Sequence, residues 1–376
     1  MKNKSILFIF GTRPEAIKLA PLIMECRNSP ATLDVHVCVT AQHREMLDQV
    51  LRFFEITPDH DLDIMKAGQT LFEVTTESLT GLQHVIQSIA PDWVIVQGDT
   101  TTVFTAALAS FYSRIKIAHV EAGLRSFNKF APFPEEMNRV MTSHLADFHF
   151  CPTENARANL LKEGIREEDI AVVGNTVIDA LLYGVSKVKH FTADSFGNAF
   201  KGVDHQHFSK KIILVTGHRR ENFGKPFEDI CGALQDLAAR DDVVIVYPVH
   251  LNPNVRKPVF DILQGIGNIH LIEPLDYPAF IWLMEKSYLI LTDSGGVQEE
   301  APSLGKPVLV MREVTERMEG VEAGTAKLVG TDRERIVREA GMLLDDPARY
   351  SAMAGRKNPY GDGKSSQRIR EVLSER

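Results

Sequence analysis

Short apolar runs alternate with amphipathic segments along the chain, and this alternation limits the possible folds more than any other feature. In the first half the apolar runs fall at 5–10, 33–39, 93–97, 115–120, 148–151 and 170–173. The segments between them repeat apolar residues at helical spacing. Strands that are apolar at nearly every position fit a parallel sheet that helices cover on both faces. We therefore predict an α/β fold.

A second series of strands and helices follows a polar stretch at 188–210, which we interpret as a connector or a solvated loop. Its apolar runs fall at 211–215, 243–249, 269–272, 288–292 and 307–311. Two such series in 376 residues predict two doubly wound, Rossmann-like domains, at 1–178 and 179–358, with a helical tail at 359–376. Ligands of these sheets bind beyond the carboxyl ends of the strands, so two facing domains would form one cleft.

Composition excludes several classes of function. The 42 Lys and Arg residues and 50 Asp and Glu residues give a net charge of −8, which disfavours binding to nucleic acid. Four scattered cysteines, no signal peptide and no apolar run of roughly 20 residues predict a cytoplasmic protein that does not enter the membrane. No G-x-G-x-x-G follows a strand and no paired Cys/His set occurs, so we expect neither a cofactor nor a metal.

Three loops at strand ends predict a binding site for a diphosphate. The Asp-Ser-Gly-Gly segment at 293–296 turns from a strand into a helix, where free N–H groups suit an anion, although an ordinary capped turn gives the same pattern. Glu300 lies one turn into that helix, where an acid can accept hydrogen bonds from a ribose. The loops at Gly11–Lys18 and His218–Arg220 follow strands and carry cations, which bind phosphate oxygens.

Carboxylates also follow neighbouring strands of the first series. Asp99 comes after the strand at 93–97, and Glu121 directly follows the strand at 115–120. Glu135 and Glu136 stand at the start of a predicted helix, and Glu136 on its own would be interpreted as solvated surface. Because the carboxyl ends of parallel strands meet at one edge of a sheet, these acids beside cationic loops suit proton transfer.

The motifs that contain these residues resemble one known family over essentially the whole chain. They read FGTRPEAIKLAPL, TAQHREMLDQVL, QGDTTTVF, HVEAGLRS, PFPEEMNR, GNTVIDAL, VTGHRREN, YPVHLNPNV and LTDSGGVQEEAPSLGKPVLVMR. Nine motifs in this order are similar to those of the non-hydrolysing UDP-N-acetylglucosamine 2-epimerases. The resemblance implies the GT-B architecture with the active site in the interdomain cleft, a homodimer, and a C-terminal helix that returns to the first domain.

The resemblance further implies reversible C2 epimerisation of UDP-N-acetylglucosamine to UDP-N-acetylmannosamine. The implied route is anti elimination of UDP to 2-acetamidoglucal and re-addition of UDP, and its product would feed cell-envelope polysaccharide synthesis. The partners would then be the two nucleotide sugars and UDP. Three alternatives stay open: a GT-B glycosyltransferase that uses a UDP-sugar, a hydrolysing epimerase that releases free N-acetylmannosamine, and a nucleotide-sugar-binding regulator.

The family match gives roles to individual residues. The acid/base candidates are Asp99, Glu121 and Glu135, with His218 near the departing phosphate. The positions that hold nucleotide and sugar are Arg13, Lys18, Ser294, Gly295, Gly296 and Arg317. Leu275 and Phe280 match the uracil pocket, and Glu300 matches the ribose contact. Which carboxylate acts on which face of C2 is left open.

Two positions depart from the family pattern. Met318 stands where many members have proline, in the loop that carries Arg317. Some members also bind a second UDP-N-acetylglucosamine as an allosteric activator, near segments that match Gln42, His43, Gln69 and Glu136. An arginine that helps there in those members is Gly68 in this chain, which puts such regulation in question.

Overall fold

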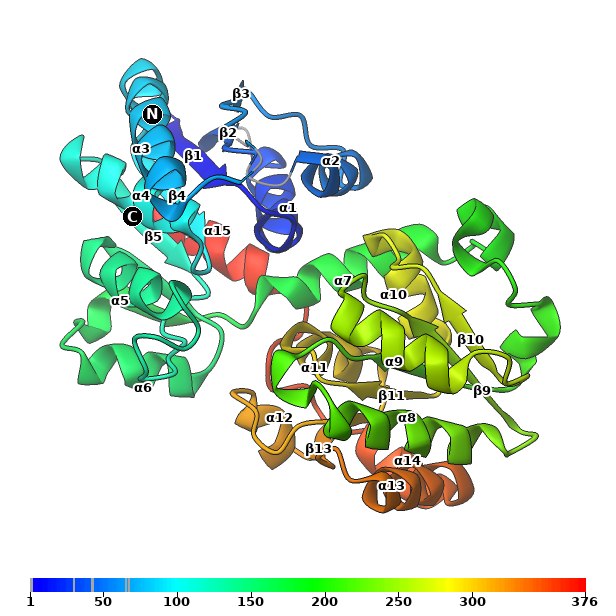
Figure 1. The fold of residues 1–376 in the computed structure, drawn as a ribbon. Helices are drawn as coiled ribbons and strands as arrows, with labels where there is room; N and C mark the ends of the chain where they lie inside the picture. The colour runs from blue at the N-terminus through cyan, green and yellow to red at the C-terminus, as the bar shows by residue number, and fades with distance from the viewer. Residues whose placement is uncertain (1–2, 30, 42–43, 65, 67) are drawn as a thin grey trace. The chain divides into compact units, whose positions relative to one another are not determined.

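The computed structural model describes the whole chain except residues 1–2, 30, 42–43, 65 and 67. The chain folds as two compact units, drawn in Figure 1. Unit 1 consists of Met1–Ala180 and Tyr360–Arg376, and unit 2 consists of Leu181–Pro359. The chain therefore passes from unit 1 to unit 2 inside a helix, α7 (Thr176–Val188).

Unit 1 contains a parallel sheet of seven strands in the order β3-β2-β1-β4-β5-β6-β7. The strands are β1 (Lys4–Phe10), β2 (Leu33–Val39), β3 (His60–Asp61), β4 (Trp93–Gln97), β5 (Lys116–Val120), β6 (Phe148–Cys151) and β7 (Ile170–Val172). The six strands predicted for this half are confirmed. The strand β3 was not predicted, because two polar residues carry no apolar pattern.

The helices of unit 1 form two groups. They are α1 (Arg13–Arg27), α2 (Arg44–Phe53), α3 (Leu71–Ile89), α4 (Thr101–Tyr112), α5 (Glu135–Leu145), α6 (Glu154–Lys162), the start of α7, and α15 (Ser365–Glu375). Helix α1 packs against α2 and α15, whereas α4 packs against α3 and α5. The strand order reverses between β1 and β4, so right-handed crossovers place these groups on opposite faces of the sheet. The sheet is doubly wound, as predicted.

Unit 2 repeats this design with six parallel strands in the order β10-β9-β8-β11-β12-β13. The strands are β8 (Lys211–Thr216), β9 (Val243–Pro248), β10 (Ile269–Ile272), β11 (Leu289–Thr292), β12 (Val308–Val310) and β13 (Ala326–Leu328). The helices are α8 (Lys225–Ala238), α9 (Pro253–Leu263), α10 (Tyr277–Lys286), α11 (Gly295–Glu300), α12 (Met318–Glu322), α13 (Arg333–Asp345) and α14 (Pro347–Ala354). The five predicted strands are confirmed, while β13 and α14 were not predicted.

Burial explains why the strands are so uniformly apolar. The side chains of Ile6–Phe10 in β1 and of Val243–Val246 in β9 have no exposed surface. Helices on both faces of each sheet exclude water from both sides of these strands. All four cysteines are buried and unpaired. Across the described residues, no helix is both long and apolar enough to cross a membrane.

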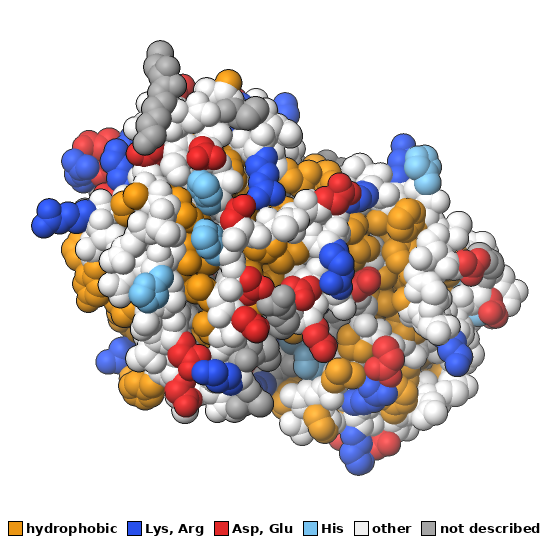
Figure 2. Space-filling model, turned by 90° about the horizontal axis from the view of Figure 1, so that it is seen from above, with side chains coloured by type: hydrophobic (Ala, Val, Ile, Leu, Met, Phe, Trp, Pro, Cys, Tyr) orange, Lys and Arg blue, Asp and Glu red, His pale blue; other side chains and the backbone are white. Residues whose placement is uncertain are grey.

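The surface mixes charges of both signs. On the face drawn in Figure 2, acidic and basic side chains are interspersed with one another and with hydrophobic ones. The net charge of the chain is −8. A surface of this kind does not favour a polyanionic partner, so we still expect that the protein does not bind nucleic acid.

The segment at 188–210 differs from its prediction as a connector or solvated loop. It forms two short 3₁₀ stretches that belong to unit 2. Phe196, Phe200 and Phe208 pack around Trp282 of α10, with ring centroids 5.4, 5.0 and 5.2 Å from the indole. The phenylalanines recur at no fixed spacing, so the sequence carried no periodic signal that they would share one partner.

The C-terminal helix α15 is fixed to the rest of unit 1 along its length. At its start, Asp179 of α7 accepts hydrogen bonds from the backbone N–H groups of Ser365 at 3.3 Å and Ser366 at 2.8 Å. Further along, Arg370 pairs with Glu25 of α1 at 3.1 Å. The end of the chain is thereby held against its first helix.

We expect Asp179→Ala to destabilise unit 1 by about 1–2 kcal/mol, because two N–H groups at a helix start lose a buried acceptor. Asp346 offers a matched control, since it caps α14 through two N–H groups but its side chain is 45 % exposed. Water can replace that acceptor, so Asp346→Ala should cost less. Urea unfolding, followed through Trp93 in unit 1 and Trp282 in unit 2, measures both effects. Equal losses in the two variants would contradict the buried-cap interpretation.

Candidate active site

A buried carboxylate joins two loops at the point where the strand order of unit 1 reverses, which is where doubly wound sheets bind ligands. One oxygen of Glu15 accepts hydrogen bonds from the N–H groups of Gly11 at 2.9 Å and Thr12 at 2.7 Å. Its other oxygen accepts a hydrogen bond from the Thr100 hydroxyl at 2.5 Å. Burial raises the pKa of the Glu15 carboxyl above its ordinary 4.5, although these donors act against that rise. The loops after β1 and β4 therefore form one connected structure.

We call the carboxyl edge formed by the loops after β1, β4 and β5 the unit 1 rim. Arg13 is the first residue of α1, directly beyond the loop that Glu15 holds. Lys18 lies further along α1 and donates a hydrogen bond to the carboxylate of Glu121 at 2.5 Å. The structure thus pairs a cation predicted to bind substrate with a carboxylate predicted to move a proton.

The Glu121 turn is strained and closely packed. Glu121 has a φ of +64°, in the left-handed region, which costs a non-glycine residue on the order of 1–3 kcal/mol. Gly123 has a φ of +88°, and a Cβ there would lie 2.2 Å from the carbonyl oxygen of Ala156 in α6. Besides Lys18, the amide of Asn175 donates a hydrogen bond to the Glu121 carboxylate at 2.9 Å. The turn and its two donors fix this carboxylate at the rim.

Asp99 follows β4, the neighbour of β5 in the sheet. Arg139 of α5 binds one oxygen of its carboxylate through Nε at 2.9 Å and Nη2 at 2.7 Å, and Asn138 donates to its carbonyl oxygen at 2.9 Å. The Nε2 atom of His119 lies 2.8 Å from the carbonyl oxygen of Gly98. Burial lowers the pKa of His119 to about 3, so the ring is neutral and its Nε2–H donates to that carbonyl. The turn that presents Asp99 is therefore held from α5 and from β5.

Glu135 and Glu136 begin α5 but have different surroundings. Glu136 is 2 % exposed and accepts hydrogen bonds from the N–H groups of Ser126 at 3.0 Å and Phe127 at 2.9 Å, and from Arg139 at 3.0 Å. Burial on its own would raise the pKa of Glu136, but these donors outweigh it and the pKa is lowered. The interpretation of Glu136 as solvated surface is wrong. Glu135 is half-buried, and its carboxylate has no hydrogen-bond partner in the described part of the chain.

Unit 2 also has a buried carboxylate that joins two loops where its strand order reverses, between β8 and β11. Asp293 is fully buried, and its Oδ2 accepts hydrogen bonds from the N–H groups of His218 and Arg219, both at 2.8 Å. Its Oδ1 lies 3.4 Å from Nδ1 of His218. Burial lowers the pKa of His218 below its ordinary 6.5, although Asp293 acts to raise it. The ring is therefore neutral at neutral pH, and it stacks on His250 with 5.4 Å between centroids.

Glycine at the first position of α11 leaves room for a guanidinium beside the turn after β11. Helix α11 begins at Gly295, directly after Ser294, and a Cβ on Gly295 would lie 3.0 Å from the guanidinium carbon of Arg317. Arg317 in turn donates to Glu299 of α11 at 2.9 Å. The guanidinium is thus positioned by the glycine turn and by α11. Met318 starts α12 directly after it.

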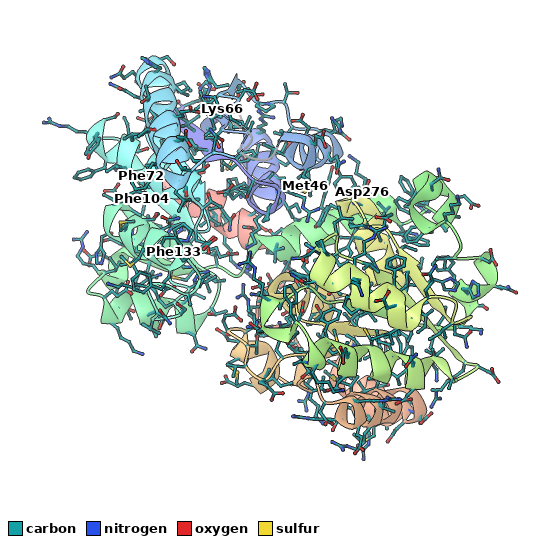
Figure 3. All side chains as sticks on the ribbon, in the orientation of Figure 1. Met46, Lys66, Phe72, Phe104, Phe133 and Asp276 are labelled. Atoms are coloured by element: carbon teal, nitrogen blue, oxygen red, sulfur yellow. The ribbon has the colours of Figure 1, made fainter. Side chains whose placement is uncertain are left out.

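The remaining predicted residues of unit 2 lie on α10, α11 and the loop before α10. Leu275 and Phe280 are half-buried on either side of the start of α10. Asp276, labelled in Figure 3, caps that helix by accepting a backbone N–H at 3.0 Å. Gly296 and Glu300 lie on α11, and Glu300 is 8 % exposed. All of these follow the carboxyl ends of β10 or β11.

Comparison with known proteins identifies the family. The family model described as UDP-N-acetylglucosamine 2-epimerase matches residues 24–374. A UDP-N-acetylglucosamine 2-epimerase from Yersinia pestis is 56 % identical over 369 residues, which cover 98 % of each chain. The chain belongs to the UDP-N-acetylglucosamine 2-epimerase family.

Epimerases are isomerases. Solved structures of members of this family have the same fold as this chain. The enzyme from Neisseria meningitidis, bound to UDP-GlcNAc, matches with a TM-score of 0.89 and 49 % identity, over 99 % of this chain and 100 % of that one. The enzyme from Methanocaldococcus jannaschii, in complex with UDP-GlcNAc and UDP, matches with a TM-score of 0.80 and 36 % identity, also over 99 % and 100 %. The two doubly wound sheets are those of this family.

The residues predicted for an allosteric site are not brought together by the contacts seen here. Gln42 and His43 lie outside the described residues. Gln69 donates to the carbonyl oxygen of Ile64 at 2.7 Å and to Glu77 at 3.1 Å. Glu136 is bound within its own loop and by Arg139, as described above. Allosteric activation therefore stays a prediction.

Four residues at these two edges were given no role from the sequence. They are Glu15, Arg139, Asn175 and Asp293. The spacing of Thr12 and Glu15 fits a capping box, which could have indicated that Glu15 points back to the preceding loop. The others contact groups 40 to 75 positions away along the chain, and a single sequence carries no local signal of such pairings.

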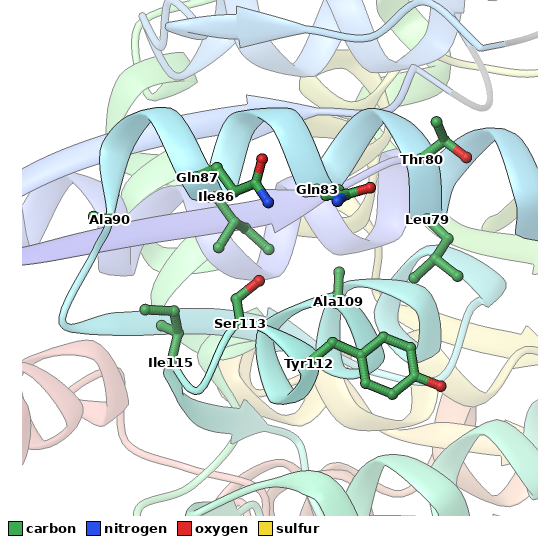
Figure 4. Close-up of a pocket in the computed structure, with 10 residues that line it drawn as sticks. All are labelled: Leu79, Thr80, Gln83, Ile86, Gln87, Ala90, Ala109, Tyr112, Ser113 and Ile115. Carbon is green, nitrogen blue, oxygen red and sulfur yellow. The ribbon is translucent and has the colours of Figure 1, made fainter.

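A pocket of about 470 Å³ lies between α3 and α4, away from the unit 1 rim (Figure 4). Its lining comes from the later turns of α3 and α4 and from Ile115, just before β5. These segments lead into β4 and β5, so the pocket lies at the amino ends of the strands. The ten residues that line it, Tyr112 among them, are uncharged. The carboxylates and cations expected to act at the unit 1 rim are absent from the lining of this pocket.

Replacing Glu136 should change how stability depends on pH. Because the pKa of Glu136 is lowered by folding, its ionised form stabilises the fold above its unfolded pKa, and that contribution is lost as the pH falls through the folded value. Glu136→Gln should therefore melt at a lower temperature than the wild type at pH 7, and the difference should shrink below about pH 4. Glu375→Gln, at the chain end, serves as the control and should melt like the wild type. A difference that stays constant between pH 7 and pH 3 would contradict this interpretation.

Proposed function

We propose that this protein is a non-hydrolysing epimerase that interconverts UDP-N-acetylglucosamine and UDP-N-acetylmannosamine. The observation that carries the proposal is family membership over residues 24–374 together with carboxylates at the ends of adjacent strands, β4 and β5. The relatives named above support the substrate, since one is bound to UDP-GlcNAc and another to UDP-GlcNAc and UDP. The product would be consumed in the assembly of cell-envelope polysaccharide.

The chemistry of the sugar requires more than simple deprotonation. The C2 proton is not adjacent to a carbonyl group, so a carbanion at C2 would have no stabilisation. In the proposed route a base takes the C2 proton while the C1–O bond breaks, and the electron pair of the C–H bond forms the C1=C2 double bond of 2-acetamidoglucal. UDP departs with the electrons of the C1–O bond. For the return, a β-phosphate oxygen adds to C1 and a proton is delivered to the opposite face of C2.

The unit 1 rim supplies the groups for proton transfer. Asp99 and Glu121 are fixed by Arg139 and by Lys18 with Asn175, whereas Glu135 has no partner among the described residues. Removal and return of a proton on opposite faces needs acid/base groups on both sides of the ring, and general acids and bases act at hydrogen-bond distance. Three carboxylates, one after β4 and two at the ends of the connection between β5 and α5, favour this over a glycosyltransferase, which needs one base and an acceptor.

Unit 2 supplies the groups that hold UDP while it is detached. Ser294, Gly295 and Gly296 form the turn into α11, and the guanidinium of Arg317 lies beside Gly295. We propose that the N–H groups of this turn and this guanidinium bind the diphosphate. Leu275 and Phe280 are proposed to enclose the uracil, and Glu300 to bind the ribose. The neutral imidazole of His218 can donate a hydrogen bond to the departing phosphate.

The assembly and location of the protein stay predictions. We expect a homodimer and a cytoplasmic location, which buried, unpaired cysteines support because free thiols persist in a reducing compartment.

Isotope labels test the reaction itself. In D₂O the UDP-N-acetylmannosamine formed should carry deuterium at C2, because a rim carboxylate exchanges its proton with water. Substrate with ¹⁸O in the bridge between C1 and the β-phosphorus should move label into the non-bridging β-phosphate oxygens, because detached UDP can rotate its phosphate. NMR and mass spectrometry read both labels. An epimerised product with neither label would refute elimination, and free N-acetylmannosamine would show a hydrolysing enzyme instead.

Amide variants test the carboxylates. Asp99→Asn, Glu121→Gln and Glu135→Gln should each slow turnover by on the order of 10²–10⁴, which is the usual contribution of a positioned acid or base. UDP affinity, measured by calorimetry, should be retained, because these groups are assigned to the sugar. Glu154→Gln is the matched control on α6, with a side chain that is 74 % exposed, and should keep wild-type turnover. Full activity in all three rim variants would exclude the assignment.

A further inference from the structure

Asn175 makes more contacts than its position at the start of α7 requires. It is 3 % exposed, and its Oδ1 accepts a hydrogen bond from the N–H of Val177 at 3.1 Å, which caps the helix. Its backbone N–H donates to the carbonyl oxygen of Tyr360 at 2.6 Å. Its amide nitrogen donates to the carboxylate of Glu121 at 2.9 Å. One residue therefore joins a helix start, the returning chain and a rim carboxylate.

The contacts around Asn175 lie where the chain passes between the two units. The outward passage follows Ala180 within α7, and the return passage ends at Tyr360. Val177, Ile178 and Tyr360 form a small hydrophobic cluster beside Asn175. Gly174 has a φ of +90°, and a Cβ there would lie 3.3 Å from the carbonyl oxygen of Tyr360. This junction holds the backbone of Asn175 on both sides.

The cap alone does not explain why the residue is asparagine. Serine, threonine and aspartate cap helices about as well through a side-chain oxygen. Only asparagine, of these four, adds an amide N–H that can donate to a carboxylate while its oxygen accepts the capping bond. That second bond reaches Glu121, 54 positions earlier in the chain, and it shares the oxygen that Lys18 binds. The choice of residue therefore serves Glu121.

We propose that Asn175 is a positioning residue for the epimerisation, which orients the Glu121 carboxylate together with Lys18 and connects it to both chain passages. This inference rests on the proposed function. Proton transfer from C2 depends on a base held within a fraction of an ångström of its reacting position, and a misplacement of about 1 Å can cost 10²-fold in rate. Asn175 fulfils this need without touching substrate in our assignment.

Asn175→Asp separates the two roles of the side chain. The aspartate oxygen can still cap Val177, but the amide donor is replaced by an oxygen that faces Glu121. We expect kcat to fall about 10–100-fold with KM for UDP-N-acetylglucosamine changed less than about threefold. Lys18 of α1 and His119 of β5, whose ring is neutral, also interact with Glu121. A second carboxylate should therefore move the acid limb of the kcat profile to higher pH.

The acid limbs of the two enzymes provide a readout that depends on pH. Because protonation of the carboxylate pair begins at a higher pH in Asn175→Asp, the ratio of wild-type to variant kcat should rise as the pH is lowered through this limb. Asn268→Asp is the control, because it removes amide donors to the carbonyls of Ala238 and Arg240 before β10. We expect that variant to melt at a lower temperature with an unchanged kcat profile. If Asn175→Asp does not fold, Asn175→Ser keeps a capping oxygen, is too short to reach Glu121, and should show the same fall in kcat.

A readout without turnover keeps this inference separate from the proposed function. With ¹³C-labelled glutamate, the Glu121 carboxyl signal, assigned by its loss in Glu121→Gln, should titrate at higher pH in Asn175→Asp than in the wild type. If the wild type does not epimerise but this shift occurs, the proposed function fails and the positioning contact stands. Wild-type kcat and an unshifted Glu121 signal in the variant would overturn the inference, as would a loss of stability and kcat with both profiles unchanged.

Discussion

Each sheet of this protein depends on a buried carboxylate that joins two loops where the strand order reverses. At such a point neighbouring loops diverge, and backbone N–H groups are left without partners in the sheet. Glu15 accepts hydrogen bonds from these loops on both of its oxygens, and Asp293 accepts two backbone N–H groups on Oδ2 alone. The donors offset much of the desolvation of the buried group. The loops that each carboxylate joins carry the residues of that edge.

The carboxylates of the unit 1 rim differ in the hydrogen-bond partners that hold them. Asp99 is bound by a guanidinium and Glu121 by an ammonium and an amide, so both have defined orientations. Glu135 has no partner in the described residues, and its neighbour Glu136 instead holds the preceding loop. These adjacent acids of α5 thus have different roles, because Glu136 holds the preceding loop and Glu135 does not. A reaction that moves a proton between two faces of a ring can use this difference.

The sequence was informative where a signal is local. Strands such as β9, and β1 from Ile6 onward, are apolar because both faces are covered, and that pattern is visible in a single sequence. Short β13 and the aromatic cluster around Trp282 carry no such pattern, so they were missed. At the site, strand-end loops pointed to Asp99, Glu121 and the glycine turn. The partners of these residues could not be predicted, because pairing Asp99 with Arg139 depends on how distant segments pack.

The two edges differ in what they are tied to. Asp293 binds only loops of unit 2, so the groups assigned to the nucleotide are held within that unit's own sheet. Glu121 combines a left-handed backbone with contacts from α1 and from Asn175, which is itself bonded to Tyr360 at the return passage. The return passage therefore contacts the carboxylate assigned to proton transfer through Asn175, and it also contacts α11, because Asn358 donates a hydrogen bond to the carbonyl oxygen of Glu299 at 2.8 Å.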